Sequence, residues 1–177
     1  FPDLPVEEEG RLHDLPLREN FFERVFTAHR WQEYLRMDGS ARGLITFHAR
    51  HKYLLMSHSR PHLTQLGRLV SGAGKADLPS LQAEYRKLLM EGMKRKATVK
   101  KNTDVLQHIV GYFKKVLPAD EKVEVLEVIG QYHDHLVPLV VPVTLLRHFV
   151  RKTQEPYLRD QVYLHPHPAE LMLRNHT

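Results

Sequence analysis

Apolar residues recur every three or four positions along most of the chain, which is the spacing of a helix with one buried face. No alternating pattern long enough for a strand occurs. The sequence therefore predicts an all-α fold, a single bundle of about seven helices with irregular N- and C-terminal segments. The predicted helices span residues 18–37, 41–57, 61–69, 77–94, 104–117, 120–132 and 142–150.

Turn and cap residues divide the chain further. Residues 1–17 contain three prolines and an acidic run, so we expect a linker or lead-in there, followed by one helical domain over 18–177. Asn102 or Thr103 is expected to cap the helix over 104–117. Gly111 falls inside that helix, where glycine costs about 1 kcal/mol relative to alanine. Its presence suggests that another backbone, of protein or of nucleic acid, approaches closely.

The composition narrows the chemistry. The chain has 177 residues, of which 42% are hydrophobic and none is cysteine. Disulfides, thiolate nucleophiles and cysteine-held iron–sulfur clusters are therefore excluded within it. No apolar run is long enough to span a membrane and no signal-peptide pattern opens the chain, so we expect a cytoplasmic protein without a membrane partner. The first residue is Phe1, which suggests a piece of a longer protein.

Charge is concentrated in the middle of the chain. Residues 39–122 hold 16 Lys and Arg against 6 Asp and Glu, whereas the whole chain has a net charge of +5. A stretch of one sign favours a partner of the other sign, and nucleic acid is the commonest such partner for a basic domain. The alternative is that lysines only solvate exposed helix faces.

Several cationic positions are candidates for nucleic-acid contacts. A run of five cations precedes a predicted helix start, where free N–H groups and the helix dipole favour phosphate, although Asp104 could occupy the same dipole. The alternative is a flexible, solvated loop. Other candidates share one side of the helix over 41–57, or lie on the exposed sides of the helices over 104–117 and 142–150. The full set is His48, His51, Lys52, Lys94, Arg95, Lys96, Lys100, Lys101, His108, Lys115, Arg147 and Arg151.

Thirteen histidines also raise a metal hypothesis. A metal site needs three or four convergent ligands, and the pair His48 and His51 has no nearby acid, so we expect no protein-held metal. No nucleophile elbow, Walker loop, dinucleotide fingerprint or HExxH motif occurs, and no catalytic residue is nominated.

Four strings then identify a family. They are FHARHKYLLMSHS (47–59), NTDVLQHIVGYFKK (102–115), PLVVPVTLLRHF (138–149) and YLHPHPAELMLRN (163–175). In this order they resemble the YbgA domain, and the resemblance covers nearly all of residues 18–177. One departure is His133-Asp134-His135, where a shorter, glycine-bearing link is expected.

The lead-in PVEEEGRL (5–12) resembles the junction at which YbgA domains follow a TudS-like desulfidase domain. Such fused proteins are similar to desulfidases that act on thiouracil or on 4-thiouridine in tRNA. The resemblance implies a non-catalytic, tRNA-binding accessory domain whose partner is an N-terminal TudS-like domain. It also implies that a [4Fe–4S] cluster belongs only to that partner, so no cofactor is expected in this chain. The alternatives are a structural module that stabilises the desulfidase domain, or a ligand- or metal-binding enzyme domain built on the histidines.

Overall fold

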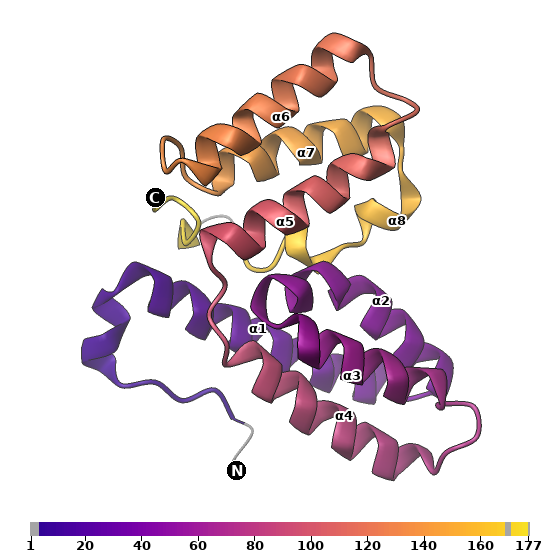
Figure 1. Ribbon diagram of the computed structural model, residues 1–177. Coiled ribbons are helices and arrows are strands. Elements are labelled where there is room, and N and C mark those ends of the chain that lie inside the picture. The colour runs from indigo at the N-terminus through magenta and orange to yellow at the C-terminus, as the bar shows by residue number, and fades with distance from the viewer. Residues whose placement is uncertain (1–3, 169–170, 177) are drawn as a thin grey trace.

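The computed structural model describes residues 4–168 and 171–176 (Figure 1). Over these residues the chain forms eight α-helices and three short 3-10 helices and no strand, which confirms the all-α prediction. The α-helices are α1 (Leu15–Met37), α2 (Ala41–His58), α3 (Arg60–Ser71), α4 (Leu78–Met93), α5 (Val99–Val110), α6 (Ala119–His133), α7 (Val140–Thr153) and α8 (Pro156–Arg159). The 3-10 helices are η1 (Glu9–His13), η2 (Gly111–Phe113) and η3 (Val162–Leu164).

The helices form two groups, with α1–α4 in the lower half of Figure 1 and α5–α8 in the upper half. Helix α2 joins the groups, because it packs against α3 and α4 on one side and against α5 and η3 on the other. The segment after α7 returns through α8 and η3 to lie against α2. The chain crosses between the groups in the link from α4 to α5.

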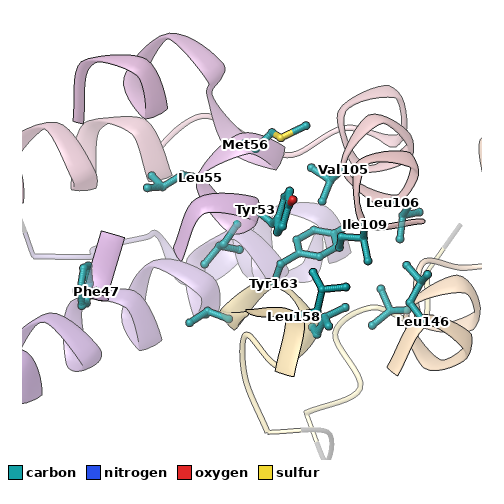
Figure 2. Close-up of a cluster of buried hydrophobic side chains, with 14 of the residues drawn as sticks. Phe47, Tyr53, Leu55, Met56, Val105, Leu106, Ile109, Leu146, Leu158 and Tyr163 are labelled. Carbon is teal, nitrogen blue, oxygen red and sulfur yellow. The ribbon is translucent and has the colours of Figure 1, made fainter. Parts of the chain in front are cut away.

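The core continues across this junction. In the first group, Trp31 stacks on Tyr85 with ring centroids 5.3 Å apart. Between the groups, the buried side chains of Tyr53, Leu158 and Tyr163 lie beside those of α5 (Figure 2). Burial of an aromatic or leucine side chain stabilises the fold by about 1.5–3 kcal/mol. The two groups therefore share one hydrophobic core.

Helix α5 differs most from the prediction. It begins at Val99, five residues before the predicted start, because the Thr98 side chain accepts a hydrogen bond from the Lys101 N–H at 3.3 Å. It ends at Val110, after which the chain tightens into η2. A Cβ at Gly111 would meet nothing within 4 Å. The inference that another protein backbone approaches Gly111 closely is therefore wrong, since none does so among the described residues.

Smaller differences occur elsewhere. Helix α1 begins at Leu15 rather than 18, with Asp14 accepting from the Leu17 N–H at 2.8 Å, and η1 occupies part of the expected lead-in. On α6, Val123 and Leu126 continue the helical spacing of the buried Ile129 but are half exposed. Residues 1–3 of the predicted lead-in, and 169–170 and 177 of the predicted domain, lie outside the described residues. None of the helices described is long and apolar enough to cross a membrane.

Candidate functional site

Residues 94–101, here called the basic segment, connect α4 to the first turn of α5. Lys94, Arg95, Lys96 and Lys100 are exposed. Across the part of the chain that the structure describes, these four side chains form no hydrogen bond or ion pair. These four side chains are therefore open to a ligand of opposite charge.

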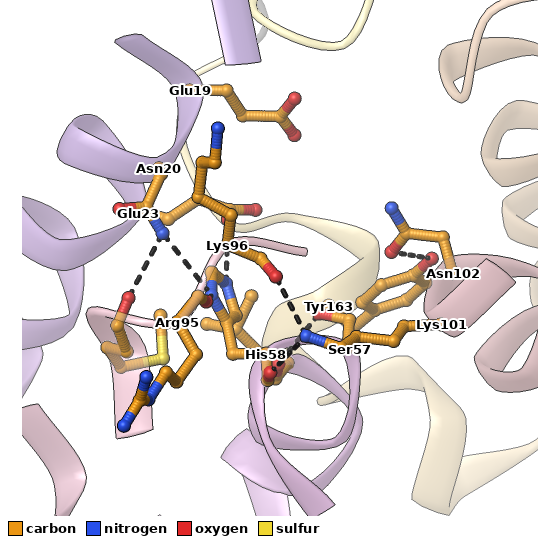
Figure 3. Close-up of polar contacts among 12 residues, drawn as sticks. Glu19, Asn20, Glu23, Ser57, His58, Arg95, Lys96, Lys101, Asn102 and Tyr163 are labelled. Carbon is orange, nitrogen blue, oxygen red and sulfur yellow. Dashed lines mark hydrogen bonds and ion pairs between the residues drawn. The ribbon is translucent and has the colours of Figure 1, made fainter. Parts of the chain in front are cut away.

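The backbone of the same segment is fixed by side chains that donate hydrogen bonds to its carbonyls. Lys101 Nζ donates to the His58 carbonyl at 2.8 Å and to the Lys96 carbonyl at 2.9 Å. His58 Nδ1 donates to the Arg95 carbonyl at 2.6 Å, and Asn20 Nδ2 donates to the Met93 carbonyl at 3.0 Å (Figure 3). Three carbonyls in and before the segment are thus held by side chains from three different helices.

His58 connects the segment to a buried carboxylate. Its Nε2 lies 2.9 Å from Glu23 Oε2, and the ring is fully buried. Its Nδ1 faces the Arg95 carbonyl and its Nε2 faces the Glu23 carboxylate, so the ring bridges the basic segment and α1. Desolvation by burial acts to raise the pKa of Glu23, but the hydrogen bonds and charges of His58 and Arg174 overcome it and lower the pKa to about 2.

Arg174, from the C-terminal segment, pairs with two carboxylates of α1. Its Nη2 donates to Glu23 Oε1 at 3.0 Å and its Nε to Glu19 Oε1 at 3.2 Å, while its Nη1 donates to the Tyr163 carbonyl at 2.7 Å. Burial and the neighbouring Glu23 charge raise the pKa of Glu19 to about 8 despite Arg174. Glu23 has the closer cations, so it keeps the negative charge while Glu19 holds a proton at neutral pH.

The network continues into the second group of helices. Tyr163 Oη donates to Asn102 Oδ1 at 3.1 Å, and Asn102 Nδ2 donates to Tyr132 Oη at 3.2 Å. Helices α1, α2, α5 and α6 and the C-terminal segment are therefore linked beneath the basic segment. A satisfied buried network of this kind fixes its members in one arrangement.

Two hollows flank the basic segment. One of about 500 Å³ lies beside the start of α3 and is lined by Met56, His58, Ser59, Arg60, Pro61, His62, Arg95 and Lys101. The other, of about 260 Å³, includes Glu19, Asn20, Thr98, Tyr132, His135 and His176 in its walls. His135 has a left-handed backbone with φ of 61°, so the turn that departs from the family pattern lies at the rim of the second hollow.

The structure places other predicted binding residues away from this segment. His51 is only 3% exposed, its ring stacks on Phe47 at 3.9 Å, and its Nδ1 donates to the Phe47 carbonyl at 2.8 Å. The prediction that His51 faces a nucleic acid is therefore wrong, because this side of α2 packs inward. His48 is half-buried with Nδ1 3.0 Å from Tyr85 Oη, whereas Lys52 is exposed.

The remaining predicted residues form separate groups. His108 and Lys115 are exposed, and Lys115 lies beyond the end of α5 from the basic segment, about 15 Å or more along the helix axis. Arg147 and Arg151 line a small hollow with Arg159 and His165 that contains no member of the basic segment. The five predicted cations of the basic segment thus form a group separate from Arg147 and Arg151, and one of the five, Lys101, is occupied by backbone carbonyls.

Sequence reasoning missed the buried residues that hold the segment in place. Asn20 and Glu23 lie on the same face of α1 as the core residues Trp31 and Tyr34. A signal was present, since polar residues continue the three-to-four spacing of that apolar face. Arg174 gave no such signal, because it lies in a segment without periodicity. In the described ranges, no three His, Asp or Glu side chains are placed to hold a metal ion together.

Comparison with known proteins identifies the family. No solved structure matches the chain. The chain is similar to the "Uncharacterized protein YbgA" of Escherichia coli (strain K12), with 27% identity over 154 residues that cover 86% of this chain and 90% of that protein. The family described as "Protein of unknown function (DUF1722)" matches residues 52–168. These matches confirm the resemblance to a YbgA-type domain, and the chain belongs to the DUF1722 family.

Proposed function

We propose that this chain binds RNA, and tRNA in particular, through the exposed cations of the basic segment. In this proposal it is the non-catalytic accessory domain of a tRNA thiouridine desulfidase, and the desulfidase partner rests on the resemblance of the lead-in sequence alone. The single observation that supports RNA binding is the difference between the backbone of the segment, which is fixed, and its side chains, most of which are free. Its carbonyls are fixed by His58 and Lys101, while the side chains of Lys94, Arg95, Lys96 and Lys100 remain exposed and unpaired in the described structure.

This contrast suits phosphate recognition. Fixing the backbone reduces the conformational entropy that the segment would lose on binding. Lys100 lies in the first turn of α5, where unsatisfied N–H groups and the helix dipole favour an anion. Asp104 does not occupy that dipole, because it lies six residues after the Thr98 cap and forms an ion pair with Arg60. The hollow beside the segment adds Arg60 and His62 to the same surface.

The test is charge reversal at the segment. We expect Lys94→Glu/Lys96→Glu/Lys100→Glu to abolish the binding of tRNA that the unaltered chain shows at micromolar concentration. Each substituted side chain is exposed and unpaired in the described structure, so the fold should be retained, as thermal unfolding can verify.

The matched control reverses three exposed cations, Arg42, Arg68 and Lys75. Lys75 precedes α4, whose 16 residues place it about 24 Å from Lys94. This control should retain most of the affinity at the same net charge. Equal losses in the two variants would show attraction by net charge only. If neither variant loses affinity, or the unaltered chain binds no tRNA, the structural-module alternative is favoured.

A further inference from the structure

A hollow of about 450 Å³ lies between α1 and α2, and no member of the basic segment lines it. Arg30 and Tyr34 from α1 and Phe47, Arg50 and His51 from α2 form part of its wall. His51 is the residue whose outward orientation the sequence suggested and the structure overturns. Its position here is therefore unexplained by nucleic-acid binding.

His51 contributes a buried acceptor without a partner. Its Nδ1 faces the Phe47 carbonyl at 2.8 Å, so Nδ1 carries the proton and Nε2 carries the lone pair. Burial lowers the pKa of His51 to about 3, which keeps the ring neutral. Nε2 is enclosed and has no hydrogen-bond partner in the part of the chain described. Buried polar atoms are seldom left unsatisfied in native proteins, so this acceptor is available to a hydrogen-bond donor.

Two arginines lie beside that acceptor. Arg30 Nη2 donates to the carbonyls of Pro166 at 2.6 Å and His165 at 3.2 Å, but its Nη1 is buried with no partner among the described atoms. Arg50 is exposed and is held by a long hydrogen bond of 3.4 Å to the Asp160 carbonyl. Both guanidinium charges act on His51 and help to lower its pKa. One end of the hollow thus offers positive charge, an unused donor and an unused acceptor.

The lining of the hollow also contains two acidic residues, Asp38 and Glu33. Asp38 lies eight residues from Arg30, about 12 Å along the axis of α1, and its Oδ1 accepts from the Ser40 N–H at 3.2 Å. Glu33 is 3.6 Å from His29 Nε2. Asp38 is therefore distant from the group formed by Arg30, Arg50 and His51, here called the cationic end, whereas Glu33 lies one helical turn from Arg30 and its charge acts on it.

We propose that this cationic end binds a small oxyanion that retains a proton, of which hydrogen phosphate is the simplest. The arginines would take the negative charge, and the O–H of the anion would donate to His51 Nε2. Sulfate has no proton at neutral pH and offers only acceptors, so it leaves Nε2 unsatisfied. A phosphodiester also lacks an O–H, so the site is separate from the proposed RNA surface. Because Nε2 is enclosed, a side chain that lines the hollow has to shift for the anion to reach it.

The test is calorimetric titration of the whole chain with inorganic phosphate and with sulfate, at neutral pH and constant ionic strength. Phosphate should bind with one-to-one stoichiometry and at least about tenfold more tightly than sulfate, which is the effect of one hydrogen bond to a charged group. Equal affinity for the two anions, or no binding of phosphate at millimolar concentration, would overturn the proposal.

Three variants separate the roles of charge and acceptor. Arg50→Ala should weaken both anions alike, whereas His51→Leu should remove the preference for phosphate, and His51→Gln, which keeps an acceptor, should retain part of it. His133→Leu, an exposed histidine on α6, is the matched control and should bind as the unaltered chain does. If His51→Leu does not fold, the ¹⁵N chemical shift of His51 Nε2 in the unaltered chain decides the question. A shift that phosphate leaves unchanged contradicts the proposal.

Discussion

Replacing Glu19 by glutamine should stabilise the protein, although Glu19 contacts Arg174. The folded chain raises the pKa of this carboxyl from its ordinary 4.5 to about 8, first because of burial and then because of Glu23. Between these two pH values the folded state binds more protons than the unfolded state, so stability falls as pH rises. Glutamine is neutral at every pH and keeps an oxygen that can accept from Arg174, so it avoids this loss.

The gain in the free energy of unfolding depends on how far the pH lies above 4.5, the ordinary pKa of the Glu19 carboxyl. Each pKa unit corresponds to about 1.36 kcal/mol, so Glu19→Gln should gain almost nothing near pH 4.5 and up to about 3 kcal/mol at pH 7. The gain should level off at up to about 5 kcal/mol above pH 8. The pKa of Glu23, lowered to about 2, acts only below pH 4.5 and leaves this window unaffected.

The gain is measured by urea unfolding of the unaltered chain and of Glu19→Gln at several pH values between about 5 and 8. Histidines that titrate in this range affect both proteins equally, so their contribution cancels when one free energy of unfolding is subtracted from the other. A gain that rises with pH supports a protonated Glu19. If Glu19→Gln is instead destabilised by the same amount at every pH, Glu19 is ionised and paired with Arg174, and the reasoning fails.

Two further predictions concern stability and are checked by the same unfolding assay. Arg174→Met should lower the free energy of unfolding by about 3–5 kcal/mol, because it leaves the buried Glu23 without the arginine that pairs with it. A loss below about 1 kcal/mol would contradict this. Gly111→Ala should raise it by about 0.5–1 kcal/mol, since the backbone there is helical and a Cβ meets nothing within 4 Å. Gly92→Ala is the contrasting case and should be destabilising, because its Cβ would lie 2.9 Å from His62 Cβ. If Gly111→Ala is destabilised instead, a neighbouring group crowds position 111 and the prediction for it is wrong.

Helices with a continuous apolar face were predictable from the sequence. The helix expected over 41–57 is observed as Ala41–His58, because Ser40 caps it and the chain turns at both ends. The start of α5 was not predictable in the same way. Thr98, Asn102 and Thr103 are all acceptable caps, and the residues between them are too polar to show which one the tertiary structure selects.

The candidate site was only partly predictable for a different reason. The charge of the basic segment is evident from the sequence, but the availability of each cation depends on distant residues. Lys101 is occupied by the carbonyl of His58, 43 residues away. Glu23 meets Arg174 across 151 residues. Such contacts follow from how the helices pack, which local periodicity does not determine.

The dependence of tRNA affinity on salt tests the central claim, RNA binding by the basic segment, most directly. The slope of log affinity against log salt is about −0.9 for each duplex phosphate neutralised. The four free cations of the segment therefore predict a slope near −3.6, or a loss of about 150-fold between about 50 and about 200 mM salt. With three of the four reversed, the slope should fall to about −0.9 or less in magnitude. A slope near zero in the unaltered chain, or one that the reversal leaves unchanged, would contradict RNA binding through this segment.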